Sequence, residues 1–216
     1  MSKEKNVVEF YLLCNKLKNV LRTGWTQWGV QADRVESVAE HVFGTQMLAI
    51  SMWSEYSYDL DIKKVLCMLA VHETEEILIG DLTPFDISKE EKQELGKQAV
   101  KKVFGHLENA EYFAELTSEF DEKKTKEAKF AFWCDKLECD IQCKLYDEQN
   151  LVDLNKQENN KDFNNPMVQN VIKEEKTWSK AWLRFGQMRY NYDENFLKIS
   201  DFVKNNTISK DGELKR

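Results

Sequence analysis

Two of the three histidines of this chain stand beside acidic residues. His41 directly follows Glu40, and His72 opens the run His72-Glu73-Thr74-Glu75-Glu76. His72 and Glu76 are four residues apart, so on a helix they would share one face. Neutral imidazole and carboxylate groups together suit a divalent metal ion, and such an ion lowers the pKa of a bound water molecule. The pattern therefore indicates metal-assisted hydrolysis.

The same residues also allow an ordinary structural interpretation. A histidine in a helix is usually a half-buried or surface residue, and acid-rich helix ends are usually solvated. The run is not the zinc-protease pattern H-E-x-x-H, because position 76 holds glutamate. The third histidine, His106, follows Gly105 at an expected helix boundary and is interpreted as a surface residue. Spacing alone leaves both interpretations of His72 open.

The order of several motifs along the chain adds information. These motifs are Arg34-Val35-Glu36-Ser37-Val38-Ala39-Glu40-His41, His72-Glu73-x-x-Glu76, Gly80-Asp81-Leu82-Thr83-Pro84, and Asp135 within Phe132–Glu138. The combination resembles the HD-domain metal-dependent phosphohydrolases. Within them it is similar to the 5′-deoxynucleotidases of the bacterial YfbR type and their eukaryotic HD-domain-containing relatives. The resemblance covers roughly residues 8 to 150 and implies an all-helical fold that binds one divalent metal ion.

The resemblance implies a ligand set for that ion, whose identity would be Co, Mn, Zn, Mg or Fe. The implied ligands are His41, His72, Glu73 and Asp135. Position 73 departs from the family, which has aspartate there. Glutamate still offers carboxylate oxygens, but its extra methylene moves them by about 1 Å or more. Two consequences stay open: a changed metal preference or affinity, or a site that has lost its chemistry.

The resemblance also implies roles for residues around the metal. Glu76 and Asp81 match acids that activate water or protonate the leaving oxygen, and Asp81 is the first choice for this proton transfer. Arg22, in the segment Arg22-Thr23-Gly24-Trp25, would hold the substrate phosphate, for which a planar guanidinium is well suited. Trp25 would shape the pocket for the sugar or the base.

The implied reaction is hydrolysis of (deoxy)nucleoside 5′-monophosphates by attack of a metal-bound water on phosphorus. One alternative is an HD phosphohydrolase that acts on a nucleotide phosphodiester or pyrophosphate. Such sites often carry additional histidines for a second metal, and this chain has only three in total. The other alternative is a catalytically degenerate HD-fold module that binds nucleotides, for which Glu73 is the sequence support. A homodimer with a small-molecule nucleotide substrate is expected, without nucleic-acid or membrane partners.

Apolar periodicity predicts the helices that would position these residues. The expected helices cover residues 4–21, 38–56, 62–79, 89–105, 107–120 and 121–147, with a last one after Pro166. Ser37 and Ser88 each begin a capping box, and Gly80 fits a helix C-terminus. Residues 22–34 and 151–165 are expected to be irregular. We therefore predict an all-α fold of about six to eight helices. It would be a single HD domain over residues 1–216, with a core at about 8–150, a C-terminal helical extension at 166–204 and a frayed tail at 205–216.

Composition is consistent with this fold and excludes others. The chain has 216 residues, of which 42% are hydrophobic and 32% charged, as in an ordinary globular domain. Only eight glycines and two prolines are present, too few for the many turns of an all-β domain. The net charge of −7 argues against a general nucleic-acid binder. No apolar run approaches the roughly 18 residues of a membrane span. Five cysteines without a C-x-x-C pair favour a reduced, cytoplasmic protein.

Overall fold

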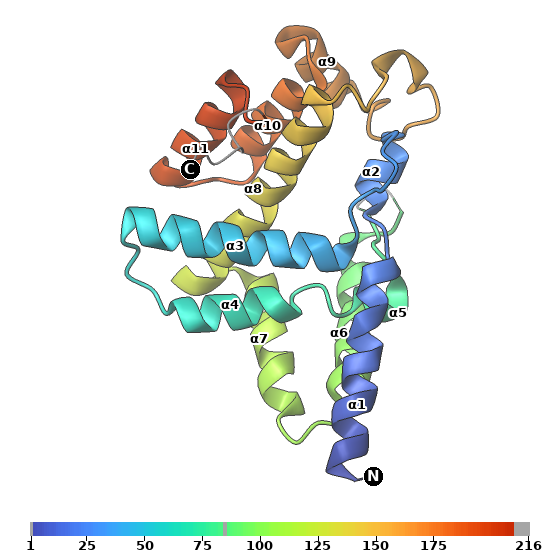
Figure 1. The fold of residues 1–216 in the computed structure, drawn as a ribbon, viewed down its shortest axis with the longest axis vertical. Coiled ribbons are helices and arrows are strands. Elements are labelled where there is room, and N and C mark those ends of the chain that lie inside the picture. Colours follow the sequence, from blue (N-terminus) through green and yellow to red (C-terminus); the bar gives the residue numbers. More distant parts are fainter. Residues whose placement is uncertain (1, 84–85, 210–216) are drawn as a thin grey trace. The chain divides into compact units, whose positions relative to one another are not determined.

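The computed structural model of the chain describes residues 2–83 and 86–209 (Figure 1). The elements in these residues are helices, and the one extended pairing among them is an isolated antiparallel bridge between Leu21 and Ser37. The expected all-α fold is confirmed. The chain divides into two compact units, which we call the first unit (residues 2–23 and 36–134) and the second unit (residues 24–35 and 135–209). The single domain expected over residues 1–216 stays a prediction.

The first unit is built from helices that pack in neighbouring pairs. Its elements are α1 (Lys3–Cys14), η1 (Asn15–Asn19), α3 (Val38–Tyr56), α4 (Ile62–Val71), α5 (Glu76–Ile79), α6 (Lys89–Phe104), α7 (Ala110–Glu122) and the first part of α8 (Lys126–Glu148). Helix α3 packs on α4, and α6 packs on α7. Their buried faces carry apolar side chains such as Val38, Ala49, Met68 and Val103. Burial of these side chains from water is the main stabilising contribution.

Local capping signals place several helix ends where the sequence predicts them. Ser37 and Ser88 both form complete capping boxes with the glutamates three residues later. Asp61 caps α4 by accepting from two backbone N–H groups. Gly80 follows α5 with a φ of 75°, a conformation that glycine adopts without strain. Pro84, which the sequence places in the loop after Gly80, lies outside the described residues.

Two expected helices of the first unit are interrupted. The helix expected to reach Leu21 ends at Cys14 and continues as the 3-10 turn η1, which buries Leu17. The helix expected over 62–79 ends at Val71 and resumes at Glu76. At the break, the Thr74 hydroxyl and the Thr74 backbone N–H both donate to the Val71 carbonyl, so this carbonyl is bonded within a tight turn. The expected placement of His72 and Glu76 on one α-helical face is therefore wrong.

The second unit holds three helices where one was expected after Pro166. They are α9 (Pro166–Glu175), α10 (Trp178–Arg189) and α11 (Glu194–Asn205). Lys176 ends α9 in a left-handed conformation, and the side chains of Thr177 and Asp193 cap the next two helices. With the short α2 (Thr23–Gln27) in the expected loop, the described residues contain eleven α-helices rather than six to eight. No helix among them is both long and apolar enough for a bilayer crossing.

An aromatic cluster forms the core of the second unit. Trp25 packs edge-on against Trp178 and Tyr146, with ring centroids 6.2 and 5.5 Å away. Trp28 stacks at a tilt on Trp178 at 5.5 Å. The remaining irregular segment around η2 (Leu154–Lys156) is held to this cluster, because the Gln157 amide donates to the Trp28 carbonyl at 3.0 Å. Large rings in such arrangements contribute packing energy beyond their buried area.

Two helical glycines make a matched pair for testing the packing. A Cβ at Gly186 would lie 2.6 Å from Oδ2 of Asp140, a buried carboxylate that Tyr192 holds by a 3.0 Å hydrogen bond. We expect Gly186→Ala to lower the free energy of unfolding by about 1–3 kcal/mol through overpacking. A Cβ at Gly96 would meet only the Glu75 side chain at 3.7 Å. Gly96→Ala should therefore raise stability by about 0.5–1 kcal/mol through helix propensity. Denaturant unfolding of both variants checks this, and equal effects would contradict it.

The carboxylate of Glu148 attaches the chain after α11 to α8. It accepts from the backbone N–H groups of Ile208 and Ser209 at 2.8–3.2 Å and pairs with Lys144. Burial alone would raise the pKa of Glu148, but these donors lower it to about 2. Its stabilising contribution is therefore present above the unfolded-state pKa and is lost as the pH falls from about 4.5 to 2.

We expect Glu148→Gln to lower the free energy of unfolding at pH 7 by about 1–2 kcal/mol, because charge-assisted hydrogen bonds are replaced by neutral ones. The difference from wild type should shrink as the pH is lowered toward 3. Urea unfolding at a series of pH values measures it. A difference that stays constant with pH would show that Glu148 does not act through its charge.

Candidate metal centre

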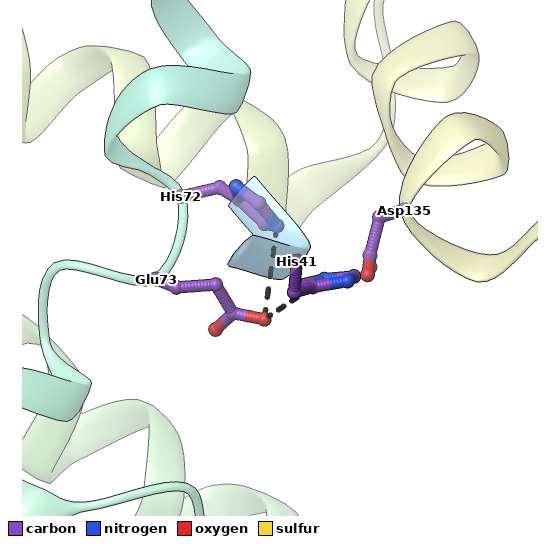
Figure 2. A group of neighbouring side chains, drawn as sticks. All are labelled: His41, His72, Glu73 and Asp135. Atoms are coloured by element: carbon purple, nitrogen blue, oxygen red, sulfur yellow. Dashed lines mark ion pairs between the residues drawn. The ribbon is translucent and has the colours of Figure 1, made fainter. Parts of the chain in front are cut away.

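The four side chains expected to bind a metal ion lie close together. One ligand atom each from His41, His72, Glu73 and Asp135 lies within 4.8 Å of all the others. Figure 2 shows the two imidazoles and the Glu73 carboxylate facing one another, with the Asp135 carboxylate beside His41. Asp135 is the first residue of the second unit and follows Cys134 within the continuous helix α8. The set thus draws on α3, on the end of α4 and the turn after it, and on α8.

The break after Val71 fixes how His72 presents its ring. His72 is the C-cap of α4, and its Nδ1 lies 2.8 Å from the Leu69 carbonyl. A carbonyl can only accept, so Nδ1 carries the proton and the lone pair is on Nε2. That nitrogen lies 3.7 Å from Oε1 of Glu73. A backbone carbonyl that fixes the tautomer in this way is typical of histidines that ligate a metal.

The distances in the cluster suit a shared metal ion. His41 is fully buried in the first turn of α3, and its Nε2 lies 3.8 Å from the same Glu73 oxygen. Two ligands about 2.1 Å from one ion are about 3.0–3.6 Å apart at the usual angles. The observed 3.7 and 3.8 Å exceed that range only slightly. Two imidazoles and two carboxylates therefore fit one divalent cation with small adjustments of the side chains.

A lysine follows the fourth candidate ligand. Lys136 Nζ lies 2.9 Å from Oδ2 of the buried Asp135. Burial alone would lower the pKa of Lys136, but the neighbouring Asp135 carboxylate raises it, so the ammonium stays charged. Lys136 thus balances the charge of a buried carboxylate. Glu138 and Cys139, on the same helix, also place ligand atoms near His41.

Glu76 is a buried acid next to the cluster. Only 1% of it is exposed, in the first turn of α5, and Lys92 Nζ lies 3.7 Å from its Oε1. Burial raises the pKa of Glu76 well above its ordinary value. The charges of Glu73 and Asp81 raise that pKa further, while Arg22 and Lys92 oppose the shift. The protonated form is therefore favoured, as a proton donor requires.

Asp81 and Arg22 meet at the start of α2. The Asp81 carboxylate accepts a 2.7 Å hydrogen bond from the Thr23 backbone N–H, and the Thr23 hydroxyl donates to the Asp81 carbonyl. Arg22 Nη1 lies 3.4 Å from Oε1 of Glu73 and 3.7 Å from Oδ2 of Asp81. The Arg22 backbone N–H donates to the Glu36 carbonyl at 3.0 Å, which holds this segment beside the start of α3. The guanidinium therefore lies beside the candidate ligands.

Two further residues, Trp25 and Lys92, have surroundings that the sequence does not indicate. Trp25, expected to shape the substrate pocket, is 2% exposed within the aromatic cluster of the second unit. Its role as a pocket wall stays a prediction. Lys92, in the charged run at the start of α6, donates to the Leu82 carbonyl at 2.7 Å and faces Glu76. Nothing in the sequence near Lys92 signals this, because its partners lie on other elements.

Comparisons with known proteins identify the family of the chain. Residues 14–164 match a protein family described as "HD domain". The relative named 5′-deoxynucleotidase HDDC2 in Dictyostelium discoideum is 35% identical over 152 residues, covering 67% of this chain and 79% of the relative. The protein of the same name in Danio rerio is 32% identical, covering 66% and 70%.

Solved structures show the same fold. The PH0347 protein of Pyrococcus horikoshii OT3 superposes with a TM-score of 0.66 at 24% identity, covering 91% of this chain and 98% of its own. A structure titled predicted metal-dependent phosphohydrolase, from Magnetospirillum magnetotacticum MS-1, gives a TM-score of 0.58 at 20% identity and covers 94% of each chain. At these identities the likeness concerns the fold alone.

Metal binding can be measured without any assay of activity. We expect chelator-treated protein to bind Mn²⁺, and His72→Ala or Asp135→Asn to weaken that binding by at least about tenfold, because each removes a ligand atom. His106→Ala is the matched control, since His106 is exposed and lies outside the cluster. Isothermal titration gives the Mn²⁺ affinities of the wild type and the three variants. Equal affinities for His72→Ala and His106→Ala would refute the assignment.

Proposed function

Because the chain belongs to the HD-domain family, we propose that it is a phosphohydrolase that removes phosphate from (deoxy)nucleoside 5′-monophosphates with the help of a divalent metal ion. The observation that carries the proposal is the convergence of four ligand atoms beside the Arg22 guanidinium. The relatives named 5′-deoxynucleotidase, at 35% and 32% identity, support the substrate class.

The residues that would hold the ion are His41, His72, Glu73 and Asp135. When bound, a divalent ion supplies positive charge that polarises a phosphoryl oxygen and lowers the pKa of nearby water. A mixed set of imidazoles and carboxylates suits Mn, Fe, Co or Zn better than Mg, which prefers oxygen ligands. Glu73 keeps its place in this set although the family has aspartate there, because its Oε1 faces both imidazoles.

Arg22 binds and orients the phosphate of the substrate. A guanidinium donates two parallel hydrogen bonds to a phosphate and cannot lose its proton at neutral pH. Only 13% of the Arg22 side chain is exposed, so its charge is weakly screened by water. The Arg22 backbone N–H donates to the Glu36 carbonyl, and its guanidinium faces Asp81, so the guanidinium is positioned to hold a phosphate beside the ligand cluster.

Two acids handle the proton. Asp81 is fixed by the Thr23 N–H, so its carboxylate is positioned to accept the proton of the attacking water or to guide the leaving 5′-oxygen. Burial and the neighbouring carboxylates raise the pKa of Glu76, which favours the form that can donate a proton or a hydrogen bond to the oxygen that gains charge. The different surroundings of Asp81 and Glu76 thus suit one carboxyl group to accept a proton and the other to donate one.

Three further expectations join the proposal. They are a homodimer, a cytoplasmic location, and the absence of nucleic-acid or membrane partners. The net charge of −7 supports the expected absence of nucleic-acid partners, because proteins bind the phosphate backbone of nucleic acids through positively charged surfaces.

A panel of nucleoside and deoxynucleoside monophosphates tests the reaction. We expect the wild type, stripped with chelator and reloaded with Mn²⁺ or Co²⁺, to release phosphate from 5′- but not 3′-monophosphates. Asp81→Asn should still bind Mn²⁺ but lose turnover by about 10²–10⁴-fold, the usual contribution of a positioned acid or base. Asp59→Asn, which alters a surface carboxylate paired with Lys126, is the control and should keep full activity.

The outcomes separate the alternatives. Full turnover in Asp81→Asn would refute the role of Asp81. Absence of phosphate release from every monophosphate, in folded protein that binds Mn²⁺, would favour a different phosphorylated substrate or a nucleotide-binding module.

A further inference from the structure

Glu73 faces two parts of the site at once. Its Oε1 atom lies 3.7 and 3.8 Å from the Nε2 atoms of His72 and His41, and 3.4 Å from Nη1 of Arg22. Figure 2 shows this oxygen directed at the two imidazoles. One carboxylate is therefore shared between the candidate metal ligands and the guanidinium that we assign to the phosphate.

The contact between Glu73 and Arg22 is electrostatically significant. Both side chains are 13% exposed, so water and salt screen their attraction much less than on the surface. A phosphate that approaches Arg22 must replace Glu73 as the partner of the guanidinium. It also meets the negative charge of Glu73 at close range, because the carboxylate lies 3.4 Å from the nitrogen that the phosphate needs.

Glu73 has the longer side chain of the two acids that face Arg22. Asp81, the other acid near Nη1, is fixed by the 2.7 Å hydrogen bond from the Thr23 backbone. Glu73 lies in the turn between α4 and α5, outside the helical ladder, and its side chain has three torsions against two in aspartate. A small rotation moves Oε1 from the guanidinium toward the imidazoles.

We propose that Glu73 couples cation binding and phosphate binding at this site. Glu73 turns fully toward His41 and His72 when a divalent cation binds, and thereby leaves Arg22 to the phosphate. Phosphate on Arg22 repels Glu73 toward the imidazoles and so strengthens the cation site. Each ligand favours the other, by the same factor, as linkage requires. The proposal rests on the proposed function for the roles of Arg22 and the cation.

The glutamate at position 73 is the source of this coupling. An aspartate would be shorter by one methylene, about 1.5 Å. It could still face the adjacent imidazoles, but its reach toward Arg22 would be shorter. The departure from the family's aspartate would then change how the two ligands depend on each other, rather than whether the site binds them.

The test uses the full-length protein, inorganic phosphate and Mn²⁺. Isothermal titration gives the phosphate affinity of chelator-treated protein, and repeats with sub-precipitating Mn²⁺ give the effect of the cation. We expect Glu73→Asp and Glu73→Gln to bind phosphate at least about fivefold more tightly than wild type without Mn²⁺, because Arg22 loses the contact with the Glu73 carboxylate that competes with phosphate. Mn²⁺ should then raise phosphate affinity by a smaller factor in Glu73→Asp than in wild type.

Two controls isolate the contact. Glu75→Asp removes the same methylene two positions along the chain, from a side chain that packs beside Gly96 of α6, and should keep the wild-type coupling. The double variant Arg22→Gln, Glu73→Gln should lose the gain in phosphate affinity seen in Glu73→Gln. Circular dichroism confirms that each variant is folded.

The outcomes distinguish the two proposals. The coupling would be overturned if wild type, Glu73→Asp and Glu73→Gln had equal phosphate affinities without Mn²⁺. The proposed function would then remain intact. A gain in Glu73→Gln that persists without Arg22 would also overturn the coupling. Failure of folded wild type to bind Mn²⁺ would overturn both proposals, and coupling without turnover would overturn the hydrolase alone.

Discussion

The site concentrates carboxylates in a space with little water, and the positive charges that balance them determine its arrangement. Glu73 and Asp81 lie close enough to Glu76 for their charges to raise its pKa. Two unit charges 4 Å apart interact by about 4 kcal/mol near a protein surface, a large share of the roughly 5–15 kcal/mol that stabilises a whole domain. Such acids therefore need a cation, a proton or a hydrogen-bond donor. Arg22 and Lys92 supply the charges, and Glu76 takes the proton.

The interruption between α4 and α5 makes this arrangement possible. In a continuous α-helix, neighbouring residues point in directions about 100° apart and do not face each other. At the break, the ring of His72 turns back on the Leu69 carbonyl, and Glu73 points so that its Oε1 lies 3.7 Å from that ring. In this turn the hydroxyl and the backbone N–H of Thr74 both donate to the Val71 carbonyl. Two consecutive residues thereby serve one centre, which a regular helix would not allow.

Local signals in the sequence predict the helix ends that depend on local chemistry. The capping boxes at Ser37 and Ser88 form as expected, since their partners are three residues away. The sequence cannot show the break after Val71, because the residues around it also suit a helix. The environment of Trp25 was also beyond prediction, as it depends on Tyr146 and Trp178, more than a hundred residues further along the chain. The family's motif order named the four residues that meet at the centre, although their spacing alone left His72 ambiguous.

A charge balance explains why this set of residues suits a phosphate monoester. The histidines are neutral as ligands, and burial favours protonated Glu76. Three carboxylates then remain charged. Arg22 faces Glu73 and Asp81, and Lys136 pairs with Asp135. Lys92 lies beside the protonated Glu76 and adds the third positive charge. The residues together are thus close to neutral, and a divalent ion adds two positive charges. A phosphate monoester carries about −1.5 to −2 charges at neutral pH, so substrate and ion together restore neutrality. Binding of both the ion and the phosphate is therefore electrostatically more favourable than binding of either one alone. Glu73 faces both positions, so each binding event acts on the other through this residue.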